Sequence, residues 1–188
     1  MFYKNERIAL VIDGQALYSA ARSIDLVLDY ASLRKEFATQ SKLMHAYFFA
    51  AIDEEAEYSS VKKLSDWMGY NGYVVRTRAL RKRIMDDGRV KTKGNMNVQI
   101  AMEARDIAQH LDHIVLFTGD GEMTYLVESI QRLGVRVTVC STIKSSEPMV
   151  SEELRKAADV FLELDDLRDK IGRDAVDDRA PRVPGHQD

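Results

Sequence analysis

The sequence predicts an α/β fold with a mostly parallel central sheet of about five to six strands and helices on both faces. Continuous apolar runs of strand length, such as residues 8–12 and 113–118, recur along the chain, as expected for strands buried on both faces of a parallel sheet. Segments of helical length separate these runs, which is the alternation of βαβ units. The 188 residues, 45% of them hydrophobic and 30% charged, are enough for one domain with its own core.

Six segments up to residue 80 alternate between strand and helix. The apolar run at 8–12 stops at Asp13, and the run at 43–52 stops at Asp53, so both are predicted strands. Gly69 closes a helical segment and is the expected C-cap of that helix. In chain order, the predicted elements are a strand at 8–12, helices at 15–25 and 30–40, a strand at 43–52, a helix at 56–69 and a strand at 72–80.

The second half of the chain follows the same pattern of strands and helices after a polar, basic stretch between residues 76 and 93. There, Asp87-Gly88 is a turn signal between two short polar runs, which predicts a β-hairpin or an ordered loop. Pro148 and Glu152-Glu153 mark the start of a later helix. The predicted elements are a helix at 97–111, strands at 113–118 and 135–140 with a helix at 122–133 between them, a helix at 148–158, a strand at 160–164 and a helix ending near 171.

Composition limits the domain organisation and the cellular setting. We expect one domain over residues 1–171, followed by a polar, disordered tail at 172–188. Cys140 is the one cysteine, which excludes an internal disulfide and predicts a buried, reduced thiol. No apolar stretch approaches the ~20 residues that span a bilayer, and the first residues lack the apolar core of a signal sequence. These features predict a cytoplasmic protein with no membrane partner.

Acidic side chains follow three of the predicted strands. Asp13 follows the first strand, Asp53-Glu54-Glu55 follow the second, and Asp120 and Glu122 follow the strand at 113–118. In open parallel sheets, ligands bind outside the carboxyl ends of the strands. Carboxylates gathered there repel each other, and a bound cation relieves the repulsion. An all-oxygen set of ligands suits Mg²⁺ or Mn²⁺ rather than zinc.

Two other interpretations of these strand ends stay open. A carboxylate directly after a strand is often only the N-cap of the next helix. The glycines beside Asp13 and Asp120 could also form turns that cradle a nucleotide phosphate. The sequence has no Walker lysine pattern and no full dinucleotide fingerprint, which disfavours the nucleotide interpretation.

A local basic stretch stands out because the whole chain has a net charge of only −3. Such a stretch is often nothing more than solvated surface. Beside an acidic metal site it also suits a phosphodiester substrate, because cations hold the backbone while the metal activates water. The acidic residues of this stretch are Asp86 and Asp87. Its basic residues are Arg76, Arg78, Arg81, Lys82, Arg83, Arg89, Lys91 and Lys93.

Motifs spread over roughly residues 6–170 match one known family in order and spacing. They are Val11-Ile-Asp-Gly, Glu57-Tyr-Ser-Ser, Asp66-Trp with Tyr70-Asn-Gly-Tyr, Lys93-Gly-Asn-Met-Asn, Asp112-His-Ile-Val-Leu-Phe-Thr-Gly-Asp-Gly, Val135-Arg-Val-Thr-Val, Ser141-Thr-Ile-Lys-Ser-Ser and Glu153-Leu-Arg-Lys-Ala-Ala-Asp. In this combination the chain resembles the NYN domain family, and most of all its bacterial LabA-like branch. The resemblance implies a PIN-like, Rossmann-like three-layer fold and a metal-dependent ribonuclease acting on RNA.

The resemblance assigns candidate roles to four acidic or amide positions. Asp13 matches the first aspartate of the family's site, and Asp120 matches the first aspartate of its Gly-Asp-Gly-Asp element. The second aspartate of that element is Glu122 here. These three residues are the candidate ligands of Mg²⁺ or Mn²⁺. Asn97 replaces the acid that ends the family's Lys-Gly-Asn-Met-Asp element, and is a candidate catalytic position without a charge.

Two further positions depart from the family pattern. The family usually has Asp-Gly-x-Asn after the first strand, whereas Ala16 stands in place of the asparagine. A later family aspartate corresponds to Glu103, a further candidate catalytic residue. Glu103 lies ~9 Å along a helix from Asn97 and ~120° around it, so the two side chains cannot both point squarely at one ion. Glu103 therefore supports the site from a distance or has a structural role.

The first functional hypothesis is a divalent-metal-dependent ribonuclease. In it, Asp13, Asp120 and Glu122 hold the ion, and RNA is gripped by the basic segment: Arg76, Arg78, Arg81, Lys82, Arg83, Lys91 and Lys93. The second is a catalytically degenerate domain that binds RNA or a protein without cleavage, because Asn97 is no general base for water. A nucleotide-binding or scaffolding domain is the third. An apolar helix face around Trp67 predicts a possible homodimer.

Overall fold

The central sheet of this computed structural model has six strands, all parallel, in the order β3-β2-β1-β6-β7-β8. The structure describes residues 2–52, 60–84, 90–93 and 95–173; of 81–84 and 90–93 it describes the backbone. The strands of the sheet are β1 (Arg7–Asp13), β2 (Lys42–Ile52), β3 (Val74–Ala79), β6 (His113–Phe117), β7 (Arg136–Ser141) and β8 (Val160–Glu163). The predicted α/β class and the parallel sheet are confirmed.

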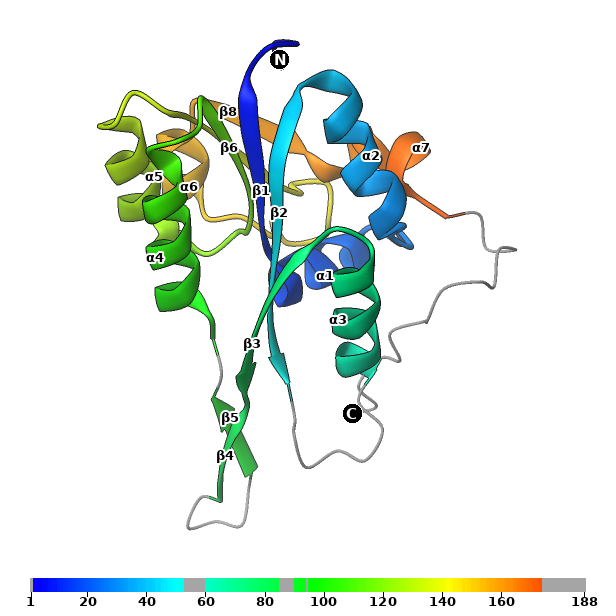
Figure 1. The fold of residues 1–188 in the computed structure, drawn as a ribbon. Helices are drawn as coiled ribbons and strands as arrows, with labels where there is room; N and C mark the ends of the chain where they lie inside the picture. Colours follow the sequence, from blue (N-terminus) through cyan, green and yellow to red (C-terminus); the bar gives the residue numbers. More distant parts are fainter. Residues whose placement is uncertain (1, 53–59, 85–89, 94, 174–188) are drawn as a thin grey trace.

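Helices cover both faces of the sheet (Figure 1). One hydrophobic cluster joins the sheet to α1 (Gly14–Ser23), α2 (Tyr30–Gln40), α3 (Ser60–Tyr70), the 3-10 turn η2 (Leu164–Leu167) and α7 (Arg168–Ile171). A second cluster on the other face involves α4 (Asn97–Ala108), η1 (Gly121–Met123), α5 (Thr124–Gln131) and α6 (Glu152–Ala157). The apolar strand runs face both clusters, which is why they lack the alternation of a half-exposed strand.

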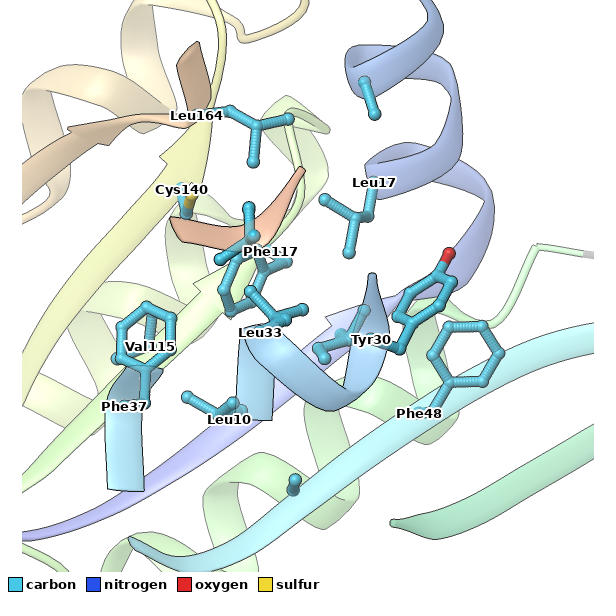
Figure 2. Packing of buried hydrophobic residues seen from close by; sticks show 14 of the residues in the cluster. Leu10, Leu17, Tyr30, Leu33, Phe37, Phe48, Val115, Phe117, Cys140 and Leu164 are labelled. Carbon is cyan, nitrogen blue, oxygen red and sulfur yellow. The ribbon is translucent and has the colours of Figure 1, made fainter. Parts of the chain in front are cut away.

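The first cluster contains most of the buried aromatic side chains of the described residues. The rings of Phe37 on α2 and Phe117 on β6 pack edge to face with their centroids 5.8 Å apart (Figure 2). Cys140 lies in the same cluster as a free, buried thiol, as predicted. Burial raises the pKa of this thiol well above its usual value, so it behaves as an inert core residue.

The order of the strands creates a switch point in the sheet. From β1 the chain winds outward through β2 and β3, and then returns so that β6, β7 and β8 extend on the other side. β1 therefore lies beside β6 although about 100 residues separate them, with Ile12 paired to Phe117. In open α/β sheets a ligand crevice forms at such a reversal, outside the carboxyl ends of the two strands.

A hairpin arm projects from the body between β3 and α4 (Figure 1). It consists of the antiparallel strands β4 (Arg81–Ile84) and β5 (Val90–Lys93), which form a sheet of their own. We call these two strands the arm. The predicted hairpin is confirmed, while its turn signal, Asp87-Gly88, lies outside the described residues.

Several element boundaries differ from the sequence-based expectations. Gly69 is not the C-cap of α3, since the helix continues to Tyr70 and the left-handed residue is Gly72, at φ +82°. The helix predicted at 148–158 begins only at Glu152, because the Ser151 side chain accepts a hydrogen bond from the backbone N–H of Leu154 and caps it there.

The chain beyond α7 is ordered for two residues more than predicted. Gly172 bridges to Leu28, and the backbone N–H of Arg173 donates to the carbonyl of Val27. The rest of the predicted tail, residues 174–188, lies outside the described residues.

Candidate functional site

Asp13 and Asp120 meet at the switch point of the sheet. Asp13 is the last residue of β1, and Asp120 follows β6 after Thr118 and Gly119. Because β1 and β6 are neighbours in parallel register, their carboxyl ends place both aspartates on one rim. Both side chains line the same pocket, whose volume is about 340 Å³.

Both aspartates also cap the segments that follow them. Asp13 Oδ1 accepts the backbone N–H groups of Gln15 and Ala16, each at 3.1 Å, at the start of α1. Asp120 Oδ1 accepts the N–H of Glu122 at 2.9 Å. The N-cap interpretation of these residues is therefore correct, but it uses Oδ1 of each carboxylate. Capping fixes the side chains in place and leaves Oδ2 of each carboxylate outside the capping hydrogen bonds.

The environment of Asp13 disfavours its charged form. Burial raises the pKa of Asp13, the hydrogen bonds from Ala16 and Gln15 lower it in part, and the negative charge of Asp120 raises it further. The net direction is upward. A cation between the two aspartates would reverse this effect, because an opposite charge favours the ionised carboxylate.

Asn97 connects Asp120 to Glu122. Its amide Nδ2 donates to Asp120 Oδ2 at 2.8 Å and to Glu122 Oε2 at 2.6 Å. The three residues come from three separate elements, α4, the end of β6 and η1. An amide N–H₂ here ties the two carboxylates together, whereas a metal ion would require the other end of the amide, Oδ1, to face it.

The walls of the pocket come from segments that sequence patterns did not single out. The residues that share it with Asp13 and Asp120 are Gln15, Ala16, Ser19, Phe49, Ala51, Asn95, Met96, Asn97, Gly119 and Met149. Gln15 and Ala16 flank a recognised motif, and Asn95 and Met96 lie within another. Ser19, Phe49, Ala51 and Met149 carry no local signal, since only packing brings them to the rim.

Gly119 allows the segment before α6 to close over the rim. A Cβ at this position would lie 1.7 Å from the carbonyl oxygen of Met149, which is far inside contact distance. That carbonyl is held by the Ser141 hydroxyl, which donates to it at 2.8 Å, and the N–H of Ser151 donates to the Gly119 carbonyl at 3.0 Å. Met149 thereby becomes a wall of the pocket.

Glu103 is turned away from the aspartates. Its Oε2 and Oε1 accept the Nε and Nη2 groups of Arg76, each at 2.9 Å, and Arg76 lies on the exposed strand β3. Asn97 joins the site at the N-terminal end of α4, while Glu103 faces β3. The two side chains leave α4 in different directions, as their angular separation predicts, so Asn97 contacts Asp120 and Glu122 while Glu103 contacts Arg76.

The basic candidates lie along β3 and the arm. Arg76 and Arg78 are on β3, where Arg78 is exposed. Arg81, Lys82 and Arg83 stand on β4, and Lys91 and Lys93 stand on β5. The acidic run Asp53-Glu54-Glu55 and Arg89 lie outside the described residues.

The oxygen atoms of Asp13 and Asp120 are ligands of the kind that hard cations such as Mg²⁺ prefer. Within the described residues, no group of three or more His, Cys, Asp or Glu side chains is placed to hold a metal ion. Mg²⁺ is commonly held by one or two protein carboxylates together with substrate phosphates and water. The carboxylates of Asp13 and Asp120 on one pocket are compatible with that pattern, and Glu122 is joined to Asp120 through the Asn97 amide.

The candidate dimer face and the membrane expectation can be placed on the structure. Trp67 packs against the first hydrophobic cluster, while Tyr70 at the end of α3 is 92% exposed. Among the described residues, no helix combines the length and the apolar character needed to cross a membrane.

Comparisons with known proteins found matches over most of the chain. A model of the NYN domain matches residues 7–165. The chain is 27% identical over 176 residues to the low amplitude and bright protein LabA of Synechococcus elongatus, covering 91% of this chain and 90% of that protein. The crystal structure of VPA0982 from Vibrio parahaemolyticus, a protein of unknown function, superposes with a TM-score of 0.70 at 26% identity, over 88% of this chain and 96% of the other.

Proposed function

Because the chain belongs to the NYN domain family, we propose that it is a divalent-metal-dependent ribonuclease that acts at the pocket of Asp13 and Asp120. The observation that carries the proposal is the convergence of these two carboxylates on one rim at the switch point of the sheet. A cation is the ligand that relieves their mutual repulsion, and an oxygen-only set favours Mg²⁺ or Mn²⁺.

In the proposed hydrolysis of a phosphodiester bond, different residues bind the metal and the RNA. Asp13 and Asp120 would hold the metal, with Glu122 as a third carboxylate. When bound, the ion lowers the pKa of a water molecule and stabilises charge on the phosphate. The backbone hydrogen bonds to Asp13 and Asp120 fix the carboxylates before substrate arrives. Arg78 of β3 and the basic residues of the arm would hold the RNA backbone electrostatically.

Cleavage of labelled single-stranded RNA in the presence of Mn²⁺ tests the proposal. Wild type should cleave, EDTA should abolish cleavage, and the Asp13→Asn/Asp120→Asn variant should lose at least about 100-fold in rate, since its carboxylates are gone. Asparagine is as good an N-cap as aspartate, so the variant should remain folded. Circular dichroism checks this point. Equal cleavage by wild type and variant, or cleavage that survives EDTA, would rule the proposal out.

A second candidate function is RNA binding without cleavage. It is favoured by Asn97, whose amide donates to Asp120 and Glu122 where the family has a carboxylate. An amide cannot accept a proton from water at neutral pH, so the site loses one potential general base. This candidate predicts RNA binding, measured by fluorescence anisotropy, that is unchanged by EDTA. Metal-dependent turnover by the wild-type protein would eliminate it.

A further inference from the structure

The ion pair between Arg76 and Glu103 joins the two elements that flank the arm. Arg76 is on β3, which leads into β4, and Glu103 is on α4, which follows β5. Both oxygens of Glu103 accept from Arg76 at 2.9 Å, so the contact is a two-point fork rather than a single bond. Such a geometry fixes the relative orientation of the two groups as well as their distance.

Tyr47 makes this contact a cluster of three residues. The Arg76 guanidinium lies over the Tyr47 ring, 5.8 Å from its centroid, and Tyr47 comes from β2. Burial raises the pKa of Tyr47, the charge of Glu103 and a hydrogen bond to it raise the pKa further, and the charge of Arg76 lowers it in part. Strands β2 and β3 and helix α4 are therefore tied together at one point.

The arm needs support of this kind at its root. It is a two-stranded ribbon with a sheet of its own, and isolated two-stranded hairpins are marginally stable in water. Its outgoing strand is held to the body by the Leu80 N–H, which donates to the Ile52 carbonyl at 2.8 Å. On the return side, β5 is followed by Asn95, Met96 and Asn97, which line the pocket. The segment that joins the arm to α4 therefore also forms part of the pocket wall.

We propose that Arg76 and Glu103 are positioning residues that clamp the root of the arm, and that neither binds RNA or metal directly. The clamp holds the basic arm in a fixed direction beside the pocket, so that RNA lying on the arm crosses the rim of Asp13 and Asp120. The functional half of this inference rests on the proposed RNA binding. Its structural half concerns the free protein alone.

Hydrogen exchange of the free protein tests the clamp without any RNA. Arg76→Ala and Glu103→Ala should each speed exchange of the amides in β4 and β5 by about 3- to 10-fold, the effect of losing a well-aligned but partly exposed ion pair. The charge swap Arg76→Glu/Glu103→Arg should restore part of the protection. Unchanged exchange of the arm in both single variants would overturn the clamp.

A matched control is available at the amino ends of the central strands β1 and β6, away from the arm. Arg7 makes a similar fork with Asp112 through Nε and Nη2, and its side chain is as exposed as that of Arg76. Arg7→Ala should leave exchange of the arm at the wild-type rate. Faster exchange in this variant as well would mean a general loss of stability and would count against a local clamp.

RNA affinity and Mn²⁺ affinity separate the clamp from the two alternatives. If the clamp acts, Arg76→Ala and Glu103→Ala both weaken RNA binding, by about 3- to 10-fold, and leave Mn²⁺ affinity unchanged. If Arg76 instead contacts phosphate, Glu103→Ala strengthens RNA binding by removing a negative charge. If Glu103 is a metal ligand, its loss lowers Mn²⁺ affinity. Either alternative result overturns the inference. A protein that binds no RNA would refute the proposed function, while the exchange experiment would still decide on the clamp.

Discussion

At the scale of single residues, Asn97 organises the hydrogen bonds of the proposed site. An aspartate at this position would place a third carboxylate beside Asp120 and Glu122 and add to their repulsion. The amide instead satisfies both through Nδ2, at 2.8 and 2.6 Å. The site is therefore internally hydrogen-bonded without a metal, and a cation must compete with those bonds. One amide in place of one carboxylate lowers both the charge of the site and its demand for an ion.

Asn97→Asp should tighten Mn²⁺ binding by at least about 10-fold and raise any RNA cleavage, because metal affinity follows the charge of the ligand set. Titration calorimetry with Mn²⁺ measures the first effect directly. Asn97→Ala serves as the control, since it removes the competing amide bridge without adding charge and should tighten Mn²⁺ binding less than Asn97→Asp does. Equal Mn²⁺ affinity in wild type and Asn97→Asp would mean that this position does not contact the ion.

At the scale of elements, the rim depends on how one segment closes against β6. Met149 precedes α6, and its carbonyl is anchored by the Ser141 hydroxyl at the end of β7. Gly119, directly after β6, leaves the space that this carbonyl occupies. Two consecutive βα connections are therefore interlocked at the pocket, and neither can shift alone.

Gly119→Ala should destabilise the fold by about 1–3 kcal/mol and disturb the pocket wall, because its Cβ would lie 1.7 Å from the Met149 oxygen. Gly69→Ala is the matched substitution. Its Cβ would meet nothing within 4 Å, and it lies inside α3, so it should stabilise the helix by about 0.5–1 kcal/mol. Thermal denaturation of both variants measures the contrast. A Tm for Gly119→Ala at or above that of wild type would contradict the interlocked rim.

At the scale of the whole molecule, charge is distributed unevenly along the chain. The full chain carries −3, and the segment 76–93 contains eight basic residues against two acidic ones. Because that segment is at +6 and the chain at −3, the remaining residues carry −9 in total. A polyanion should therefore be attracted to the segment 76–93 rather than to the rest of the chain, which would orient RNA at the moment of encounter.

RNA binding should weaken steeply with salt, and Arg78→Ala/Arg81→Ala/Arg83→Ala should reduce the slope of log K against log[salt] by about 2, as three lost phosphate contacts on a single strand imply. Fluorescence anisotropy between low and moderate salt gives both slopes. Lys35→Ala/Lys42→Ala/Lys156→Ala removes the same charge from exposed positions elsewhere and should leave the slope nearly unchanged. Equal losses in the two triple variants would show that the arm has no special part in binding.

Much of the fold could be predicted from local pattern. The apolar runs gave the strands, and the helix at Tyr30–Gln40 has the predicted bounds. The errors occur where two local signals compete. Gly69 looks like a cap, yet α3 continues to Tyr70 and the chain turns at Gly72, which is the residue that takes the left-handed conformation, at φ +82°. Pro148 looks like a helix start, yet the segment after it packs against Gly119 first.

The sequence by itself determined that Asp13 and Asp120 end strands, because the end of an apolar run is a local property. Only the tertiary structure decided that β1 lies beside β6, so that the two aspartates face one pocket. It also decided that Glu103 forms an ion pair with Arg76 and does not join Asp13 and Asp120, and that Met149 lines the pocket. These contacts join residues far apart in the chain, and the free energy that selects them comes from packing both faces of the sheet. No short pattern contains that information.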